Sequence, residues 1–124
     1  YEYFYGVQAE QFSFYRIPKA LFTEPNFREL STDAKVLYGI LLDRMSLSLK
    51  NQWLDAQNKV YIIFTVEEIM DALNCANQKA TRLMVELEKQ AGLIERKRQG
   101  LGRPNLIYVK NFAATINVKS CEKK

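Results

Sequence analysis

At 124 residues, 48% of them hydrophobic, the chain is long enough for one domain with a buried core, and its apolar runs are far too short to cross a membrane. It contains no histidine and two distant cysteines outside any CxxC pair, which excludes histidine-dependent catalysis and the usual zinc motifs, so we expect no catalytic residue, no metal and no cofactor. The net charge is +4, and the positive charge is concentrated in one stretch. Residues 1–76 hold 7 basic and 10 acidic side chains, whereas residues 77–110 hold 8 basic and 3 acidic ones. This distribution indicates either a polyanionic partner or a solvated basic face.

The start of the sequence and its cysteines indicate the setting in which the protein works. No secretory signal is present, and the sequence begins with Tyr1 rather than Met, so we expect it to be part of a longer protein. Two lone cysteines, Cys75 and Cys121, in a basic domain without histidine are best interpreted as reduced thiols. The sequence therefore predicts a cytoplasmic protein.

Aromatic side chains crowd the first 17 residues, ahead of the first long helix. The stretch 12–17 favours a strand, because aromatic side chains pack well on a pleated surface, and Pro18 ends it or begins a short helical turn through 19–22. We expect the rings to pack against the domain; a patch for self-association is the alternative. The candidate dimer contacts are Tyr3, Phe4, Tyr5, Phe12 and Phe14.

A first long helix is expected from the helical spacing of apolar residues that begins at Ala34. Ser31 is a good N-cap and Asp33 places a negative charge in the first turn, where the helix dipole favours it. The helix should run to about residue 47 or 49. Polar residues 50–59 predict a loop, and apolar residues 60–64 predict a short buried strand.

Two further helices are expected, separated by a tight turn. The sequence Thr65-Val66-Glu67-Glu68 is a capping box, which predicts a second helix that ends near Asn74. A third helix follows from about Asn77 to Gln90, with its apolar residues on one face. Gly92 closes this helix, because glycine adopts the left-handed conformation at low cost.

A basic β-hairpin is expected directly after the third helix. Residues 93–98 and 105–110 predict its two strands, and the turn between them holds Gly100 and Gly102. Positive side chains gather around this turn, where a hairpin would meet a DNA backbone. They are Arg96, Lys97, Arg98 and Arg103.

The order helix, strand, helix, tight turn, helix and basic hairpin predicts an α+β fold, mainly α: a winged helix-turn-helix with a short β-hairpin wing and an added N-terminal β/aromatic segment. In this fold the third helix enters the DNA major groove. A polar outer face is also the default for a solvated helix, and the cations of the hairpin are what favour DNA. The candidate contacts on the third helix are Asn77, Gln78, Lys79, Thr81, Arg82 and Glu86. The candidate contacts on the wing are Lys97, Arg98, Gln99, Arg103 and Asn105.

Three segments together resemble a known family. They are 12–22 (FSFYRIPKALF), 30–38 (LSTDAKVLY) and 102–109 (GRPNLIYV). The combination resembles the N-terminal domain of the replication initiator protein A family of low-copy plasmids, over nearly all of the chain from about Tyr5 to Phe112. The same domain is similar to the N-terminal domain of the primosomal DnaD family.

The resemblance implies a protein that binds repeated sites, called iterons, in the double-stranded DNA of a plasmid origin and starts replication there, in the bacterial cytoplasm. It implies a winged-helix DNA-binding domain over residues 1–112, with 1–17 as an aromatic extension and 113–124 as a linker to an absent C-terminal domain that recruits host replication proteins. Repeated sites also favour a homodimer or a higher homo-oligomer. Ala76 departs from the usual pattern, because Ser or Thr commonly caps the recognition helix.

Two alternative functions fit the same pattern. Winged helices also serve as dimerisation or scaffold modules, here of a primosome-type protein, and the aromatic N-terminal segment would suit that use. A transcriptional regulator would carry the same elements and differ only in where its target site lies. Dimerisation and DNA binding can also coexist in one domain.

Overall fold

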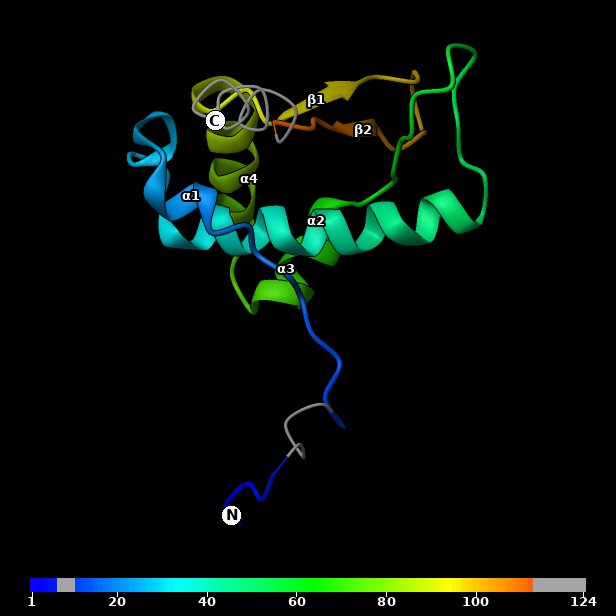
Figure 1. Cartoon of the computed structure of the whole chain (residues 1–124). Helices are drawn as coiled ribbons and strands as arrows, with labels where there is room; N and C mark the ends of the chain where they lie inside the picture. The colour runs from blue at the N-terminus through cyan, green and yellow to red at the C-terminus, as the bar shows by residue number, and fades with distance from the viewer. Residues whose placement is uncertain (7–10, 113–124) are drawn as a thin grey trace, which may run out of the picture.

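The computed structural model describes residues 1–6 and 11–112, so the predicted linker at 113–124 lies outside the described residues. Figure 1 shows the arrangement, in which α4 crosses the long α2, the β-hairpin lies above α2 and α3 lies below it. This arrangement confirms the predicted winged helix-turn-helix, α+β and mainly α. The elements are α1 (Ala20–Thr23), the 3-10 turn η2 (Pro25–Phe27), α2 (Thr32–Lys50), α3 (Val66–Leu73), α4 (Asn77–Val85), the π-helical turn η3 (Glu86–Gln90), β1 (Ile94–Lys97) and β2 (Leu106–Val109).

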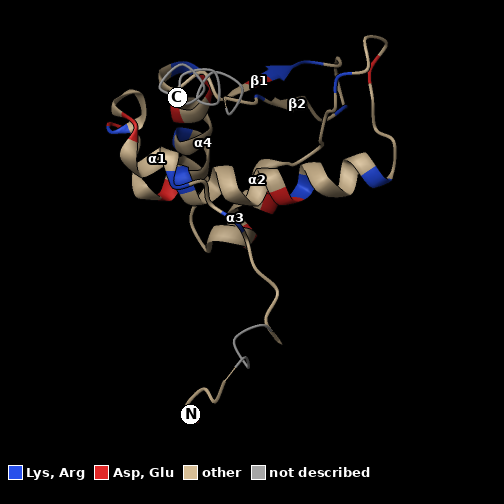
Figure 2. Ribbon diagram, viewed as in Figure 1, with Lys and Arg blue, Asp and Glu red and all other residues tan. Residues whose placement is uncertain are grey.

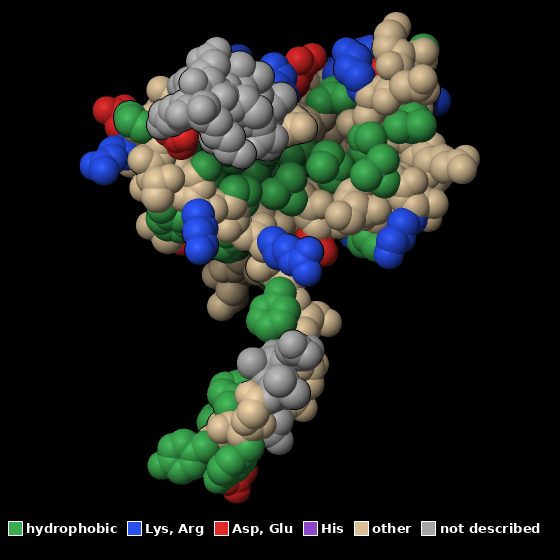
Figure 3. Space-filling view, viewed as in Figure 1, with side chains coloured by type: hydrophobic (Ala, Val, Ile, Leu, Met, Phe, Trp, Pro, Cys, Tyr) green, Lys and Arg blue, Asp and Glu red, His purple; other side chains and the backbone are tan. Residues whose placement is uncertain are grey.

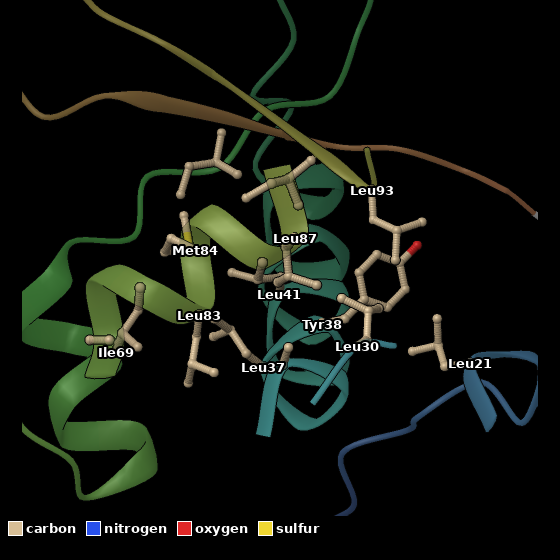
Figure 4. Close-up of a cluster of buried hydrophobic side chains, with 14 of the residues drawn as sticks. Leu21, Leu30, Leu37, Tyr38, Leu41, Ile69, Leu83, Met84, Leu87 and Leu93 are labelled. Atoms are coloured by element: carbon tan, nitrogen blue, oxygen red, sulfur yellow. The ribbon is translucent and has the colours of Figure 1, made fainter. Parts of the chain in front are cut away.

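The core is formed where α4 packs across α2. Leu37 and Leu41 of α2 face Leu83 of α4 and Leu87 at its end, and all four side chains are fully buried (Figure 4). Ile69 of α3 closes the same cluster from the other side. Because α4 buries this apolar stripe, its polar residues are left on the opposite face.

Local signals set the helix ends as predicted. The Ser31 hydroxyl accepts a hydrogen bond from the Ala34 N–H at the start of α2, and Thr65 and Glu68 form both bonds of the capping box at the start of α3. Asn74, with a φ of 51°, ends α3 in the left-handed conformation. Ala76 precedes α4 without a side-chain cap, and α4 nevertheless begins at Asn77, where the third helix was predicted to begin.

The predicted third helix, 77–90, is confirmed in extent but changes its winding. After Val85 it continues as the π-helical turn η3, in which the Ala91 N–H bonds to the Glu86 carbonyl at 3.0 Å. Gly92, with a φ of 66°, then ends it as predicted. Single π turns inside helices often occur at functional sites, because the extra residue reorients the side chains near it.

The sheet is smaller than predicted. β1 and β2 pair antiparallel, with Ile94 opposite Val109 and Lys97 opposite Leu106. The strand expected at 60–64 is reduced to bridges, in which Ile62 pairs with Ile107 through two hydrogen bonds of 2.9 Å. Pairing ends there because the chain turns into the capping box of α3 three residues later. The segment still places a third stretch of backbone beside β2.

Tyr38 ties α2 to the chain that leaves the hairpin. Its hydroxyl donates a hydrogen bond of 2.8 Å to the carbonyl oxygen of Lys110. Burial raises the pKa of Tyr38 to about 12, so the hydroxyl remains a donor at any physiological pH. This bond fixes the hairpin to the core at the end of β2.

The N-terminal segment differs from prediction in two ways. Residues 12–17 are extended but form no strand, since they cross α2 rather than run beside a sheet edge; a Cβ on Gly39 would lie 2.8 Å from Cγ1 of Ile17. The expectation that the rings pack on the domain is also wrong. Figures 1 and 3 show the segment projecting from the body, with Tyr3 at 83% and Phe4 at 61% exposure.

No helix within the described part of the chain combines the length and the apolar character that a membrane span requires.

Candidate nucleic-acid interface

The outer face of α4 carries a polar stripe. Gln78, Thr81 and Arg82 are exposed at the i, i+3, i+4 spacing that aligns side chains along one face of a helix, and Asn77 is exposed at its first position. The opposite face buries Ala80, with Leu83 and Met84 beside it. The structure therefore brings four of the predicted helix residues together at one surface.

Lys79 lies at the edge of this stripe. Its ammonium group forms an ion pair of 2.6 Å with the carboxylate of Asp33, in the first turn of α2. About four tenths of its side chain stays exposed. Lys79 therefore connects α4 to the start of α2 and keeps part of its charge at the surface.

Glu86 is a correction to the predicted interface. Its carboxylate accepts two hydrogen bonds of 2.9 Å from Ser31, one from the backbone N–H and one from the hydroxyl, and the residue is buried at 9% exposure. These bonds direct the side chain toward the start of α2, away from the outer stripe. Glu86 fixes the end of α4 to the N-terminus of α2 and does not reach the surface.

Val85 is a surface residue that the sequence prediction missed. It is 39% exposed and lies three and four residues after Arg82 and Thr81, on the same stripe. An exposed aliphatic side chain suits contact with the methyl group of thymine. The helical spacing was available in the sequence, but the sequence analysis named only polar and charged side chains on this face.

The wing projects a cluster of polar and basic side chains. Lys97, Arg98, Gln99, Arg103 and Asn105 are all exposed, as predicted. The turn between the strands is ordered by two bonds: the Gln99 side-chain amide donates to the Pro104 carbonyl at 2.8 Å, and the Arg103 N–H donates to the Gly100 carbonyl at 3.3 Å. Gln99 therefore shapes the turn that presents Arg103.

Carboxylate partners divide the cations of this region into two groups. Arg96 is paired with Glu88, and Lys110 with Glu95. Figure 2 shows Lys and Arg running along β1 and into the turn that follows it. Uncompensated cations are those free to neutralise an external anion. Within residues 1–6 and 11–112, the candidate-site cations without an ion pair are Arg82, Lys97, Arg98 and Arg103.

Arg96 is therefore not part of the exposed cluster to which the sequence assigned it. Its guanidinium and Glu88 approach at 2.7 Å, with side-chain exposures of 26% and 17%. Burial alone would raise the pKa of Glu88, but the hydrogen bonds and the charge of Arg96 outweigh it and hold the pKa below its usual value. Glu88 is ionised at neutral pH and keeps Arg96 turned toward the end of α4.

A loop before α3 adds a further cation beside the wing. The Asp55 carboxylate accepts bonds from the N–H groups of Gln57 and Lys59 and from the Tyr108 hydroxyl of β2. The hydrogen bond from the Lys59 N–H is the main cause that lowers the pKa of Asp55. The pKa of Tyr108 is raised, mainly by burial and next by its hydrogen bond to Asp55. The exposed Lys59 ammonium lies 5.5 Å from the centre of the Tyr108 ring. The sequence placed this residue in a loop without linking it to the wing.

The described residues contain no group of three or more His, Cys, Asp or Glu side chains arranged to hold a metal ion. Cys75, in the turn before α4, is a free cysteine and is partly buried.

The bonds of Glu86 to Ser31 generate a stability prediction. We expect Ser31→Ala to lower the free energy of unfolding by about 1–2 kcal/mol, because it removes both a helix cap and a donor to a buried carboxylate. Glu86→Gln should cost about 1 kcal/mol, since a charge-assisted bond becomes a neutral one. Urea unfolding of both variants and of the double variant measures the coupling; the exposed Glu29→Gln is the control. Fully additive losses for Ser31 and Glu86 would contradict the contact.

Comparison with known proteins places the chain in a family. Residues 13–123 match the family described as "Replication initiator protein A (RepA) N-terminus". A curated relative, the "41 kDa protein" of Lactobacillus helveticus, is 32% identical over 92 residues, which are 74% of this chain. The match spans 26% of that relative, so the chain corresponds to about a quarter of its length.

Solved structures share both the fold and the sequence. A chain described as "Structure of Rep-DNA complex" is 35% identical with a TM-score of 0.74, covering 96% of this chain and 95% of that one. "N-Terminal domain of DNA binding protein" is 35% identical with a TM-score of 0.73 over 98% and 96%. "Structure of MDR initiator" is 36% identical with a TM-score of 0.69 over 98% and 100%. The chain thus has a Rep-type N-terminal winged helix and belongs to the replication initiator protein A (RepA) N-terminal family.

Proposed function

We propose that this domain binds double-stranded DNA at repeated sites in a plasmid origin and thereby starts replication of the plasmid. In this proposal α4 enters the major groove, and the β1–β2 wing lies against the neighbouring backbone or minor groove. The family supports the initiator role. A relative of 35% identity described as a Rep–DNA complex supports DNA as the ligand.

The observation that carries the proposal is that unpaired cations occur on both elements expected to contact the duplex. Arg82 stands on the outer stripe of α4, and Lys97, Arg98 and Arg103 stand on the wing, without ion pairs to described carboxylates. Gly92 and its neighbours join these two elements through a short turn. Phosphate neutralisation by such cations would supply most of the affinity and a strong dependence on salt.

Sequence discrimination is assigned to the stripe on α4. Asn77 and Gln78 can pair with adenine through their side-chain amides, and Arg82 can pair with guanine. Thr81 and Val85 offer methyl groups to thymine. The wing cations, in contrast, are assigned to phosphates, which position the domain without reading sequence.

Arg82 and Arg103 test this division of labour. On a duplex carrying the repeat, Arg82→Ala should cost about 1–3 kcal/mol of binding free energy, and on a scrambled duplex much less. Arg103→Ala should weaken both duplexes alike and reduce the slope of log K against log salt by about 1. Fluorescence anisotropy at several salt concentrations measures both, with Lys50→Ala at the far end of α2 as the control. Equal losses on the two duplexes for Arg82 would contradict base reading.

A second copy of the chain is the partner that the N-terminal segment favours. Its aromatic side chains are largely exposed, and the ring of Phe12 packs edge-on against Phe4 at 5.9 Å and Phe14 at 6.3 Å. Exposed apolar surface of this kind marks a site of protein association. Repeated DNA sites suit a symmetric dimer. Dimerisation through the N-terminal segment is compatible with DNA binding through α4 and the wing, because the two roles use different surfaces.

Removal of the segment tests the dimer. We expect a chain lacking residues 1–15 to sediment as a monomer while the full chain sediments as a dimer, because the exposed rings would supply the contact. Sedimentation velocity at several protein concentrations measures this, and circular dichroism controls for folding. The same mass for both chains would remove the segment from the interface.

The rest of the protein is assigned a separate task. Because this chain corresponds to about a quarter of the curated relative, we propose that a further domain, joined through residues 113–124, recruits the host replication proteins. The same domain on a promoter would act as a transcriptional regulator, and the position of the bound site in the plasmid distinguishes the two.

A further inference from the structure

The connection between the recognition helix and the wing contains one ion pair that the DNA-binding surface does not use. Glu88 lies in the π turn η3, and Arg96 lies in the middle of β1. Two guanidinium nitrogens, Nε and Nη2, donate to Oε1 of Glu88 at 3.0 and 2.7 Å. The backbone N–H of Arg96 donates to the other carboxylate oxygen at 3.3 Å. Both oxygens of Glu88 are therefore occupied by one residue of the wing.

We propose that Glu88 and Arg96 form a clamp that sets the position of the wing relative to α4, and that Arg96 contributes to DNA binding only through Glu88. Both are positioning residues in this assignment. The proposal rests on the DNA-binding function proposed above. It separates Arg96 from its neighbours Lys97 and Arg98, although all three belong to one run of basic residues in the sequence.

The strand register places Arg96 on the inner face of the hairpin. Arg96 is opposite the buried Ile107, and Ile94, two residues earlier on the same face, is also buried. Lys97 belongs to the other face and is exposed. The guanidinium of Arg96 is therefore directed at the end of the helix, while the cation next to it in sequence is directed at solvent.

The π turn brings the carboxylate to this position. The turn begins at Glu86, which is bonded to Ser31, the N-cap of α2, and Glu88 follows two residues later. The end of the helix is thus held to the start of α2 by the carboxylate of Glu86 and to β1 by the carboxylate of Glu88. Between η3 and β1 only three residues intervene, among them Gly92 with a φ of 66°. Glycine permits many backbone directions at this junction, so contacts beyond it set the angle of the hairpin: the Glu88–Arg96 pair on the β1 side, and the Tyr38 and Ile62 bonds on the β2 side.

The energetic consequence follows from partial burial. Both side chains of the pair are mostly shielded from water, so each charge depends on the other for compensation. Loss of either partner leaves an uncompensated charge beneath the wing and removes the bonds that align it. The wing cations and α4 must contact the same duplex at once. A change in their relative position should therefore weaken binding to the repeat duplex more than binding to a scrambled duplex.

Neutral variants of the pair test the clamp, because the two remove charges of opposite sign. Glu88→Gln raises the net charge by one, which by phosphate attraction alone would strengthen binding to any duplex. The clamp predicts instead that Glu88→Gln and Arg96→Gln both weaken binding to the repeat duplex, by about tenfold, with a smaller change on a scrambled duplex. Lys97→Gln, a neutralisation on the outer face, is the matched control and should weaken both duplexes alike.

A charge exchange supplies the second measurement and guards against misfolded single variants. The double variant Glu88→Arg with Arg96→Glu keeps the net charge and restores the pair, so it should recover most of the specific binding lost by Arg96→Glu alone. Thermal unfolding is followed for every variant. Tighter repeat binding by Glu88→Gln, or no recovery in the double variant, would overturn the clamp. If the unmodified domain does not prefer the repeat duplex over the scrambled one, the proposed function itself is wrong.

Discussion

Four leucines buried between α2 and α4 determine what the rest of the molecule can do. Leu37 and Leu41 from α2 pack against Leu83 and Leu87, and this contact buries one face of α4 in the core. The remaining face has no apolar neighbour to cover it, so its polar side chains stand at the surface. The contact also fixes the end of α4, from which the wing departs.

Polar contacts at the end of α4 add directional restraints to the position that the leucine packing gives this helix. Glu86 bonds to Ser31 and Glu88 to Arg96, so the same turn is attached to the first helix of the core and to the first strand of the wing. Apolar packing alone tolerates small rotations, whereas directed charge-assisted bonds do not. Together with the bonds of Tyr38 and Ile62 on the β2 side of the hairpin, these contacts define the position of the hairpin relative to α4.

The sequence was sufficient for the helices and for most of the candidate surface, because their signals are local. Caps at Ser31 and Thr65 and the glycine at 92 lie within a few residues of the ends they define. Pairing of residues 60–64 and the course of residues 12–17 depend on distant parts of the chain, and neither was predicted correctly. Glu86 was assigned to the outer face because its partner, Ser31, lies 55 residues away in the sequence, and no local pattern reveals the bonds between them.

Methylation interference on an origin fragment tests the central claim most directly, because dimethyl sulfate modifies guanine N7 in the major groove and adenine N3 in the minor groove. If the outer stripe of α4 enters the major groove, methylated guanines inside each repeat will block binding, at positions that recur with the repeat. Interference confined to adenine N3, or spread over the fragment without a repeat, would contradict the assignment of α4 as the recognition helix.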